Sequence, residues 1–153
     1  MSSSFTIETI TPDNYKDAMF SPDQLADFLH EHLDRFRDSR ADIMKCLHYA
    51  LGITEHRRGF VLAAAENSGS EEILGIVVVC ETGMSGYVPE NLLVYIAVDA
   101  RTRGRGIGKQ LMEKAVESAR GDVALHVEPD NPAKRLYERI GFTNKYLEMR
   151  YKK

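Results

Sequence analysis

The chain has 153 residues, of which 43% are apolar and 28% are charged. A chain of this length folds as one domain around a single core, and its ordinary apolar content excludes a mainly disordered protein. Twenty basic residues against 23 acidic ones give a formal charge of −3 at pH 7. This balance excludes the strongly basic composition of general nucleic-acid binders and of proteins held on anionic membranes.

The sequence also bears on location and on thiol chemistry. The longest apolar run, 73–80, is far shorter than the roughly 20 residues that a membrane-spanning helix needs. The first residues, MSSSFT, carry neither the basic nor the apolar stretch of a signal peptide. Cys46 and Cys80 lie far apart and form no CxxC motif. We therefore expect a cytoplasmic protein with two free thiols, although one disulfide stays arithmetically open.

The first third of the chain predicts one strand and two helices. Residues 5–10 alternate apolar and polar side chains, as a half-buried strand does. Ser21 followed by proline is typical of an N-cap and first helical position, and apolar residues recur behind it at helical spacing. A second helix is predicted to start at Ser39 or Asp42 and to end before Gly52.

From residue 60 onward the pattern changes to short apolar runs separated by turn residues. Runs that are apolar on both faces predict buried strands, and glycine-rich segments predict turns. The expected elements are strands at 60–65, 73–80 and 92–98, a turn at 67–70, a loop at 83–89, a helix at 107–119, a strand at 123–127, a helix at 132–140 and extended structure at 142–151.

The order of these elements predicts the fold class. Short connections among the earlier strands favour antiparallel pairing, whereas the helix between the strands at 92–98 and 123–127 is a crossover that makes this pair parallel. We expect an α/β domain with a mixed sheet, mostly antiparallel, with one central parallel strand pair flanked by helices.

The segment that joins the strand at 92–98 to the next helix is the most informative. It reads VDARTRGRGIGKQ and contains four basic residues, Arg101, Arg103, Arg105 and Lys109. Glycines let the backbone approach a ligand closely, and the first N–H groups of a helix favour an anion. The residues therefore predict a phosphate site, with a solvated basic turn as the alternative.

This segment fits neither of two common nucleotide motifs. The P-loop motif GxxxxGK[ST] fails because Gln110 follows Lys109, and the dinucleotide motif GxGxxG fails because position 109 is a lysine. Residues 103–108, RGRGIG, instead meet the pattern [Q/R]-x-x-G-x-[G/A]. The segment resembles the acetyl-CoA signature of the GCN5-related N-acetyltransferase (GNAT) superfamily. A second block, NPAKRLYERIGF at 131–142, is similar to the family's N-x-A-x-x-LYE-x-x-GF helix.

The resemblance covers about 92–142 and implies a co-substrate and a set of binding residues. In this family the backbone amides of the turn hold the pyrophosphate of coenzyme A, so acetyl-CoA is expected, without a metal. Backbone groups at the end of the preceding strand are expected to bind the pantetheine. The residues assigned to the coenzyme by resemblance are Ile96, Ala97, Val98, Arg103, Gly104, Arg105, Gly106, Ile107, Gly108, Lys109, Asn131, Lys134 and Tyr137.

Tyr137 and Asn131 contribute the side-chain chemistry of the second block. By resemblance, Tyr137 donates a proton to the sulfur of coenzyme A, and Asn131 binds the pantetheine or a nearby backbone group. From the residues alone, Tyr137 is a core tyrosine and Asn131 is an N-cap. In many family members the asparagine lies seven residues before the tyrosine, whereas here it lies six before it and Asp130 takes that register.

No single residue is assigned as the base that takes the proton of the amine. Histone-acetylating members carry a glutamate where this chain has Leu92, and Glu90 lies two residues earlier in the predicted loop. His126 and Glu128 project to the same side of the strand at 123–127. Imidazole titrates near neutral pH, which suits an amine substrate. A purely structural histidine and a proton relay through ordered water stay open as alternatives.

The resemblance implies one N-acetyltransferase domain, 5–153, that moves acetyl from acetyl-CoA to a primary amine by direct attack in a ternary complex. The acceptor (a small molecule, a peptide N-terminus or a lysine) is not evident from the sequence. The helices at 21–51 and the loop at 82–91, with Tyr87 and Glu90, are expected to form its walls. The alternative is a non-catalytic acyl-CoA-binding or sensor module. A homodimer stays open by analogy alone.

Overall fold

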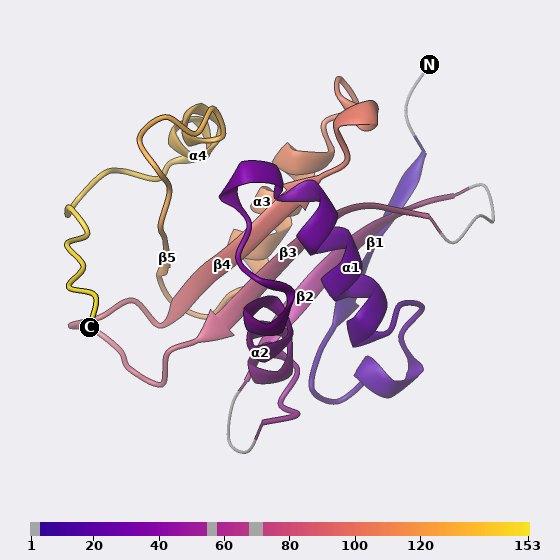
Figure 1. Ribbon diagram of the computed structural model, residues 1–153, viewed down its shortest axis with the longest axis horizontal. Coiled ribbons are helices and arrows are strands. Elements are labelled where there is room, and N and C mark those ends of the chain that lie inside the picture. Colours follow the sequence, from indigo (N-terminus) through magenta and orange to yellow (C-terminus); the bar gives the residue numbers. More distant parts are fainter. Residues whose placement is uncertain (1–3, 55–57, 68–71) are drawn as a thin grey trace.

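A computed structural model describes residues 4–54, 58–67 and 72–153, with a central sheet covered by helices on both faces (Figure 1). Three short 3-10 turns occur besides the helices and strands. In chain order the elements are β1 (Phe5–Ile10), η1 (Tyr15–Asp17), α1 (Pro22–His32), η2 (Asp34–Phe36), α2 (Arg40–Ala50), β2 (Gly59–Glu66), β3 (Ile73–Glu81), β4 (Asn91–Val98), η3 (Ala100–Thr102), α3 (Ile107–Ser118), β5 (Val123–Leu125) and α4 (Lys134–Ile140).

The five strands lie side by side in their order along the chain. The pairs β1–β2, β2–β3 and β3–β4 are antiparallel, and β4 pairs with β5 in parallel after the α3 crossover. The predicted mixed sheet and its parallel pair are thus confirmed. The parallel pair lies at one edge of the described sheet rather than at its centre, because the residues after α4 add no described strand beyond β5.

Two apolar clusters fill the space between the sheet and the helices. One cluster packs α1 and α2 against one face of the sheet, and the other packs α3 and α4 against the opposite face. Strands β2 and β3 are buried on both faces, as their continuous apolar runs predict. Gly75 in β3 lets α3 approach closely, because a Cβ there would lie 2.9 Å from Leu111 Cδ1.

Both N-terminal helices begin where their caps are predicted. The Ser21 hydroxyl accepts a hydrogen bond from the Gln24 amide, and the Gln24 side chain accepts one from the Ser21 amide, which makes a capping box. Ser39 rather than Asp42 caps α2, because its hydroxyl accepts the Asp42 amide. These caps fix the start of the two helices that cover one face of the sheet.

A β-bulge in β4 opens the sheet next to β5. Val78 pairs with Tyr95 and Val79 with Leu93, so Val94 is an extra residue without a partner in β3. The β4–β5 ladder is short and ends at the pair Leu93–Leu125. Beyond that pair, no described strand lies on the β5 side of β4. The end of β4 therefore presents an open edge.

Three predicted boundaries change in the structure. The strand expected to reach Val127 ends at Leu125, because the ladder stops at the bulge. The helix expected from Pro132 begins at Lys134, since the Lys134 amide closes a tight turn on the Asn131 carbonyl. No strand forms over 142–151, where alternate apolar side chains such as Leu147 and Met149 stay exposed instead of packing on a sheet. The predicted turn at 67–70 lies mostly outside the described residues.

Candidate functional site

The turn between β4 and α3 presents open backbone. Gly104 and Gly106 have φ angles of 87° and 74°, a left-handed conformation that favours glycine. A Cβ at either position would meet no described atom within 4 Å. Gly106 precedes α3 and provides no side-chain cap. The amides of Ile107, Gly108 and Lys109 therefore have no acceptor within the helix, and they point out of its positive end.

The four basic side chains of this turn divide into two pairs. Arg105 binds Glu66 of β2 through two nitrogens, at 3.2 and 2.8 Å, which ties the turn to the sheet. Arg101 binds the buried Asp99 and also reaches Glu72 at 3.2 Å. Its guanidinium lowers the pKa of Asp99 to about 2. The other two, Arg103 and Lys109, are exposed and form no ion pair with any described residue.

Gly108 lies where three elements meet. A Cβ at Gly108 would lie 3.6 Å from both Val98 at the end of β4 and Leu136 in α4. The first turn of α3, the open edge of β4 and the α4 helix are therefore neighbours. A hollow of about 760 Å³ lies on the other side of the turn, between β1 and the outer face of α3, and Gly106 and Lys109 are part of its lining.

Tyr137 follows Leu136 in α4 and is 6% exposed. Its ring packs against Phe142 with the ring centres 6.2 Å apart. Its hydroxyl forms no hydrogen bond with a described residue, yet no buried polar side-chain atom among the described residues lacks a partner. The phenol oxygen is therefore accessible to solvent, although the ring is buried. Burial raises the pKa of Tyr137 to about 12, which keeps the phenol protonated at neutral pH.

Asn131 and Lys134 have local partners at the start of α4. The Asn131 side-chain oxygen accepts the Ala133 amide at 2.9 Å, and the Asn131 carbonyl accepts the Lys134 amide. The Lys134 ammonium lies 3.8 Å from the Glu138 carboxylate, one helical turn away. The N-cap role expected for Asn131 is wrong, because α4 begins at Lys134 with Ala133 at the cap position and without a side-chain cap. The Asn131 side chain instead closes the turn before the helix. The Lys134–Glu138 ion pair is partly exposed and holds its members weakly.

The three residues considered as a base lie in different surroundings. Glu90 accepts the amides of Asp122 at 2.7 Å and Gly86 at 3.0 Å, and these bonds lower its pKa. It therefore holds the β3–β4 loop to the start of β5. His126 and Glu128 are exposed. The residues that alternate with them, Leu125 and Val127, pack against the apolar cluster beneath α3 and α4. The predicted alternation of these side chains is present, although β5 itself ends at Leu125.

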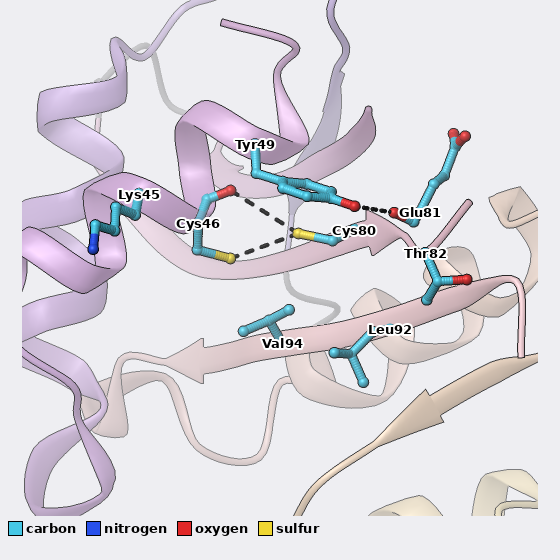
Figure 2. A pocket seen from close by; sticks show the side chains of 8 residues that line it. All are labelled: Lys45, Cys46, Tyr49, Cys80, Glu81, Thr82, Leu92 and Val94. Atoms are coloured by element: carbon cyan, nitrogen blue, oxygen red, sulfur yellow. Dashed lines mark hydrogen bonds between the residues drawn. The ribbon is translucent and has the colours of Figure 1, made fainter. Parts of the chain in front are cut away.

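A second cavity, of about 370 Å³, lies on the opposite face of the sheet, between α2 and strands β3 and β4 (Figure 2). The Tyr49 hydroxyl donates to the Glu81 carbonyl across one end of it. Leu92 and the bulge residue Val94 project into it from β4. The Glu81 carboxylate points away from its centre. The lining residues are Lys45, Cys46, Tyr49, Cys80, Glu81, Thr82, Leu92 and Val94.

The predicted walls of an acceptor site match this cavity only in part. Helix α2 and the edge of the 82–91 loop contribute to it through Tyr49 and Thr82. Tyr87 does not line it and is 82% exposed. Near it on the same face, the Tyr95 hydroxyl donates to the Asp38 carboxylate at 2.5 Å, a contact that sequence analysis missed. Tyr95 and Asp38 lie 57 residues apart, so no sequence motif relates them.

Comparison with known proteins identifies the family. A family model described as the acetyltransferase (GNAT) domain matches residues 56–144, more than half of the chain. The chain belongs to the GNAT acetyltransferase family. Among curated proteins, no significant match to this GNAT acetyltransferase is found.

Solved structures of GNAT acetyltransferases share the fold over nearly the whole chain. The aminoglycoside N-acetyltransferase AAC(6')-Iy in complex with CoA is 17% identical, with a TM-score of 0.64 and coverage of 100% of this chain and 97% of that one. Ribosomal-protein-alanine N-acetyltransferase from Brucella melitensis biovar Abortus 2308 is 18% identical, with a TM-score of 0.62 and coverage of 97% and 99%. A chain of the NatC complex bound to Gag peptide and CoA is 21% identical, with a TM-score of 0.67 and coverage of 92% and 85%. At these identities the likeness shows the fold alone.

Neither a metal-ligating cluster nor a membrane-spanning helix occurs among the described residues. No group of three or more histidine, cysteine, aspartate or glutamate side chains there is arranged to hold a metal ion. None of the helices in the described part of the chain has both the length and the apolar character needed to cross a membrane.

Proposed function

We propose that this GNAT acetyltransferase moves the acetyl group of acetyl-CoA to a primary amine, by direct attack in a ternary complex. One observation supports the proposal above all. The uncapped first turn of α3, preceded by Gly104 and Gly106 in left-handed conformation, lies beside the open end of β4 and beside α4. An anion site, an unpaired strand edge and an available phenol are thus neighbours.

The residues at the start of α3 fit the diphosphate of coenzyme A. The amides of Ile107, Gly108 and Lys109 can donate to phosphate oxygens, and the open space above Gly104 and Gly106 admits them. Arg103 and Lys109 are exposed and available to add positive charge. Arg105, bound to Glu66, contributes by holding the turn in place instead. Of the basic residues that the resemblance assigns to this turn, we therefore propose that Arg103 and Lys109 contact the diphosphate and that Arg105 does not.

The open edge of β4 fits the pantetheine arm. Past the bulge, Ile96, Ala97 and Val98 have a strand partner in β3 but none described on the other side. The Asp99 amide donates to the Leu74 carbonyl, so Ala97, two residues earlier, also directs its N–H and C=O groups toward β3. The outward N–H and C=O groups of Ile96 and Val98 can pair with the amides of pantetheine, as one strand pairs with another. The acetyl thioester is the activated group that acetyl-CoA supplies when it is bound. The bulge residue Val94 lines the cavity beside α2, so the thioester end of the arm would meet that cavity at the bulge.

Tyr137 supports the proton-transfer part of the proposal. A phenol that is buried, protonated at neutral pH and not bonded to another side chain is suited to donate to a departing thiolate. Its position next to Leu136, which faces Gly108, keeps it within the same neighbourhood as the turn. Asn131 is assigned to shaping the loop before α4, through its bond to the Ala133 amide.

The attacking amine must also lose a proton, so a second group is needed to accept it. We propose His126 for this role, with Glu128 and ordered water as the competing acceptors, because both side chains are exposed and project away from the packed cluster. Glu90 is the weakest of the residues considered, since its carboxylate already accepts two backbone amides. The cavity lined by Tyr49, Leu92 and Val94 is the proposed place for the acceptor.

The related structures do not narrow the acceptor class, because they differ in what their names state. The NatC complex was solved with a Gag peptide, and the name AAC(6')-Iy is that of an aminoglycoside N-acetyltransferase. We therefore include a small-molecule amine, a peptide α-amine and a lysine side chain within the proposal. A cytoplasmic location and a homodimer also belong to it, from the sequence and from family analogy respectively.

An acceptor panel tests the proposal. Thiol release from acetyl-CoA is followed with polyamines, aminoglycosides, peptides with a free α-amine, and α-acetylated peptides that carry one lysine. Transfer to one class above the rate of hydrolysis supports the proposal. Binding of coenzyme A without transfer to any class favours the alternative, a non-catalytic acyl-CoA-binding or sensor module. Among the described residues, no carboxylate is directed into the α2 cavity, since that of the lining residue Glu81 points away from its centre, and this observation supports the alternative.

A further inference from the structure

Two cysteines from separate elements meet in the wall of the α2 cavity. Cys46 lies on α2 and Cys80 on β3, and the sequence separates them by 34 residues. Their sulfur atoms are 3.7 Å apart, and the Cys80 thiol also lies 4.0 Å from the Cys46 carbonyl. Figure 2 shows both sulfur atoms directed toward each other across the space between the helix and the strand.

This geometry is close to that of a disulfide. An S–S bond is about 2.05 Å long, so the two sulfur atoms need to approach by roughly 1.7 Å. The cavity beside them leaves room for such side-chain rotation, because Cys46 and Cys80 are themselves part of its lining. Cys46 is only partly buried, whereas Cys80 is 9% exposed. A small oxidant in solvent can thus reach Cys46 first, with Cys80 next to it.

We propose that Cys46 and Cys80 form a reversible intramolecular disulfide when the protein meets hydrogen peroxide. One thiol attacks the O–O bond, which gives a sulfenic acid and one water. The second thiol then attacks that sulfur, forms the S–S bond and releases a second water. Two thiols are oxidised by two electrons, and one peroxide is reduced to two water molecules. The oxidant is thereby accounted for, and a dithiol reductant reverses the bond.

The surroundings set the expected speed of the reaction. The contact with Cys80, together with burial, raises the pKa of the Cys46 thiol, which keeps it protonated at neutral pH. Since the thiolate is the reactive form, oxidation is expected to take far longer than in a peroxide-sensing enzyme. The pair is thus a slow modification site, and the bond it forms joins α2 to β3 across the cavity.

Mass spectrometry tests the pair directly. Reduced protein is treated with hydrogen peroxide, denatured, and alkylated with iodoacetamide. We expect a mass about 2 Da lower, no alkylated cysteine and a peptide that joins Cys46 to Cys80, all reversed by dithiothreitol. The melting temperature of the oxidised form should rise by about 5–10 °C, because the bond closes a loop in the unfolded chain.

Two variants provide the matched controls. Cys46→Ser and Cys80→Ser should each keep one cysteine that gains only oxygen atoms and should show no rise in melting temperature with peroxide. The proposal is overturned if the native protein keeps two alkylatable thiols, gains oxygen at each thiol without a cross-link, or forms only intermolecular disulfides. Should a serine variant fail to fold, the peptide map of the native chain decides alone.

Discussion

Replacement of Tyr137 by phenylalanine removes one oxygen and leaves the packing of the ring in place. The ring is 6% exposed and packs against Phe142, whereas the hydroxyl has no hydrogen-bond partner among the described residues. Since no bond is lost in Tyr137→Phe, the free energy of unfolding should change by less than about 1 kcal/mol. A proton donor to the leaving group contributes roughly 100-fold or more to the rate.

The assay separates these two effects. We expect kcat to fall about 100-fold in Tyr137→Phe, while the Kd of coenzyme A in titration calorimetry changes less than about twofold. Tyr146→Phe is the matched control, because Tyr146 is 80% exposed and has no proposed role in the reaction. Full activity of Tyr137→Phe would refute the donor role and leave Tyr137 as a packing residue.

Three further predictions concern packing, the base and acid stability. Gly75→Val should lower the melting temperature by several degrees, since its Cβ would lie 2.9 Å from Leu111 Cδ1 and overpacking costs about 1–3 kcal/mol; an unchanged value in thermal denaturation would show that α3 packs loosely. His126→Gln should lower kcat/KM at neutral pH about tenfold or more, with coenzyme A affinity kept, and unchanged kinetics would assign the proton to water or another group. Asp99 has its pKa lowered to about 2 by Arg101, so its ionised form stabilises the fold above about pH 4, and this stability is lost as the pH falls toward 2. Urea unfolding of Asp99→Asn should therefore depend less on pH between about 4 and 2 than that of the native chain, and parallel curves would contradict this.

Local chemistry made much of the fold predictable. The serines at 21 and 39 cap helices because a hydroxyl at that position satisfies an amide of the first turn, a relation between residues only three apart. The apolar run of β3 has no polar face and is rich in β-branched residues, which is typical of a strand buried on both faces. The glycine-rich segment before α3 predicts a turn, and the structure shows that Gly104 and Gly106 in it adopt left-handed φ values.

Contacts between distant residues were not predictable. The bulge at Val94 lies in a run of apolar residues that reads as a regular strand, because an extra residue has no side-chain signature there. The Tyr95–Asp38 bond joins residues from different elements, and no periodicity relates them. The alternation at 142–151 is typical of a strand, but an alternating segment forms one only where another strand offers free backbone groups.

The central claim is that the amides at the start of α3 hold the diphosphate of coenzyme A. Titration of ¹⁵N-labelled protein with coenzyme A, followed by amide NMR, tests it residue by residue. If these amides hold the diphosphate, the largest chemical-shift changes occur at residues 104–109, with smaller ones at 96–98. Saturating binding with these amides unmoved, and with the largest shifts on another surface, would contradict it.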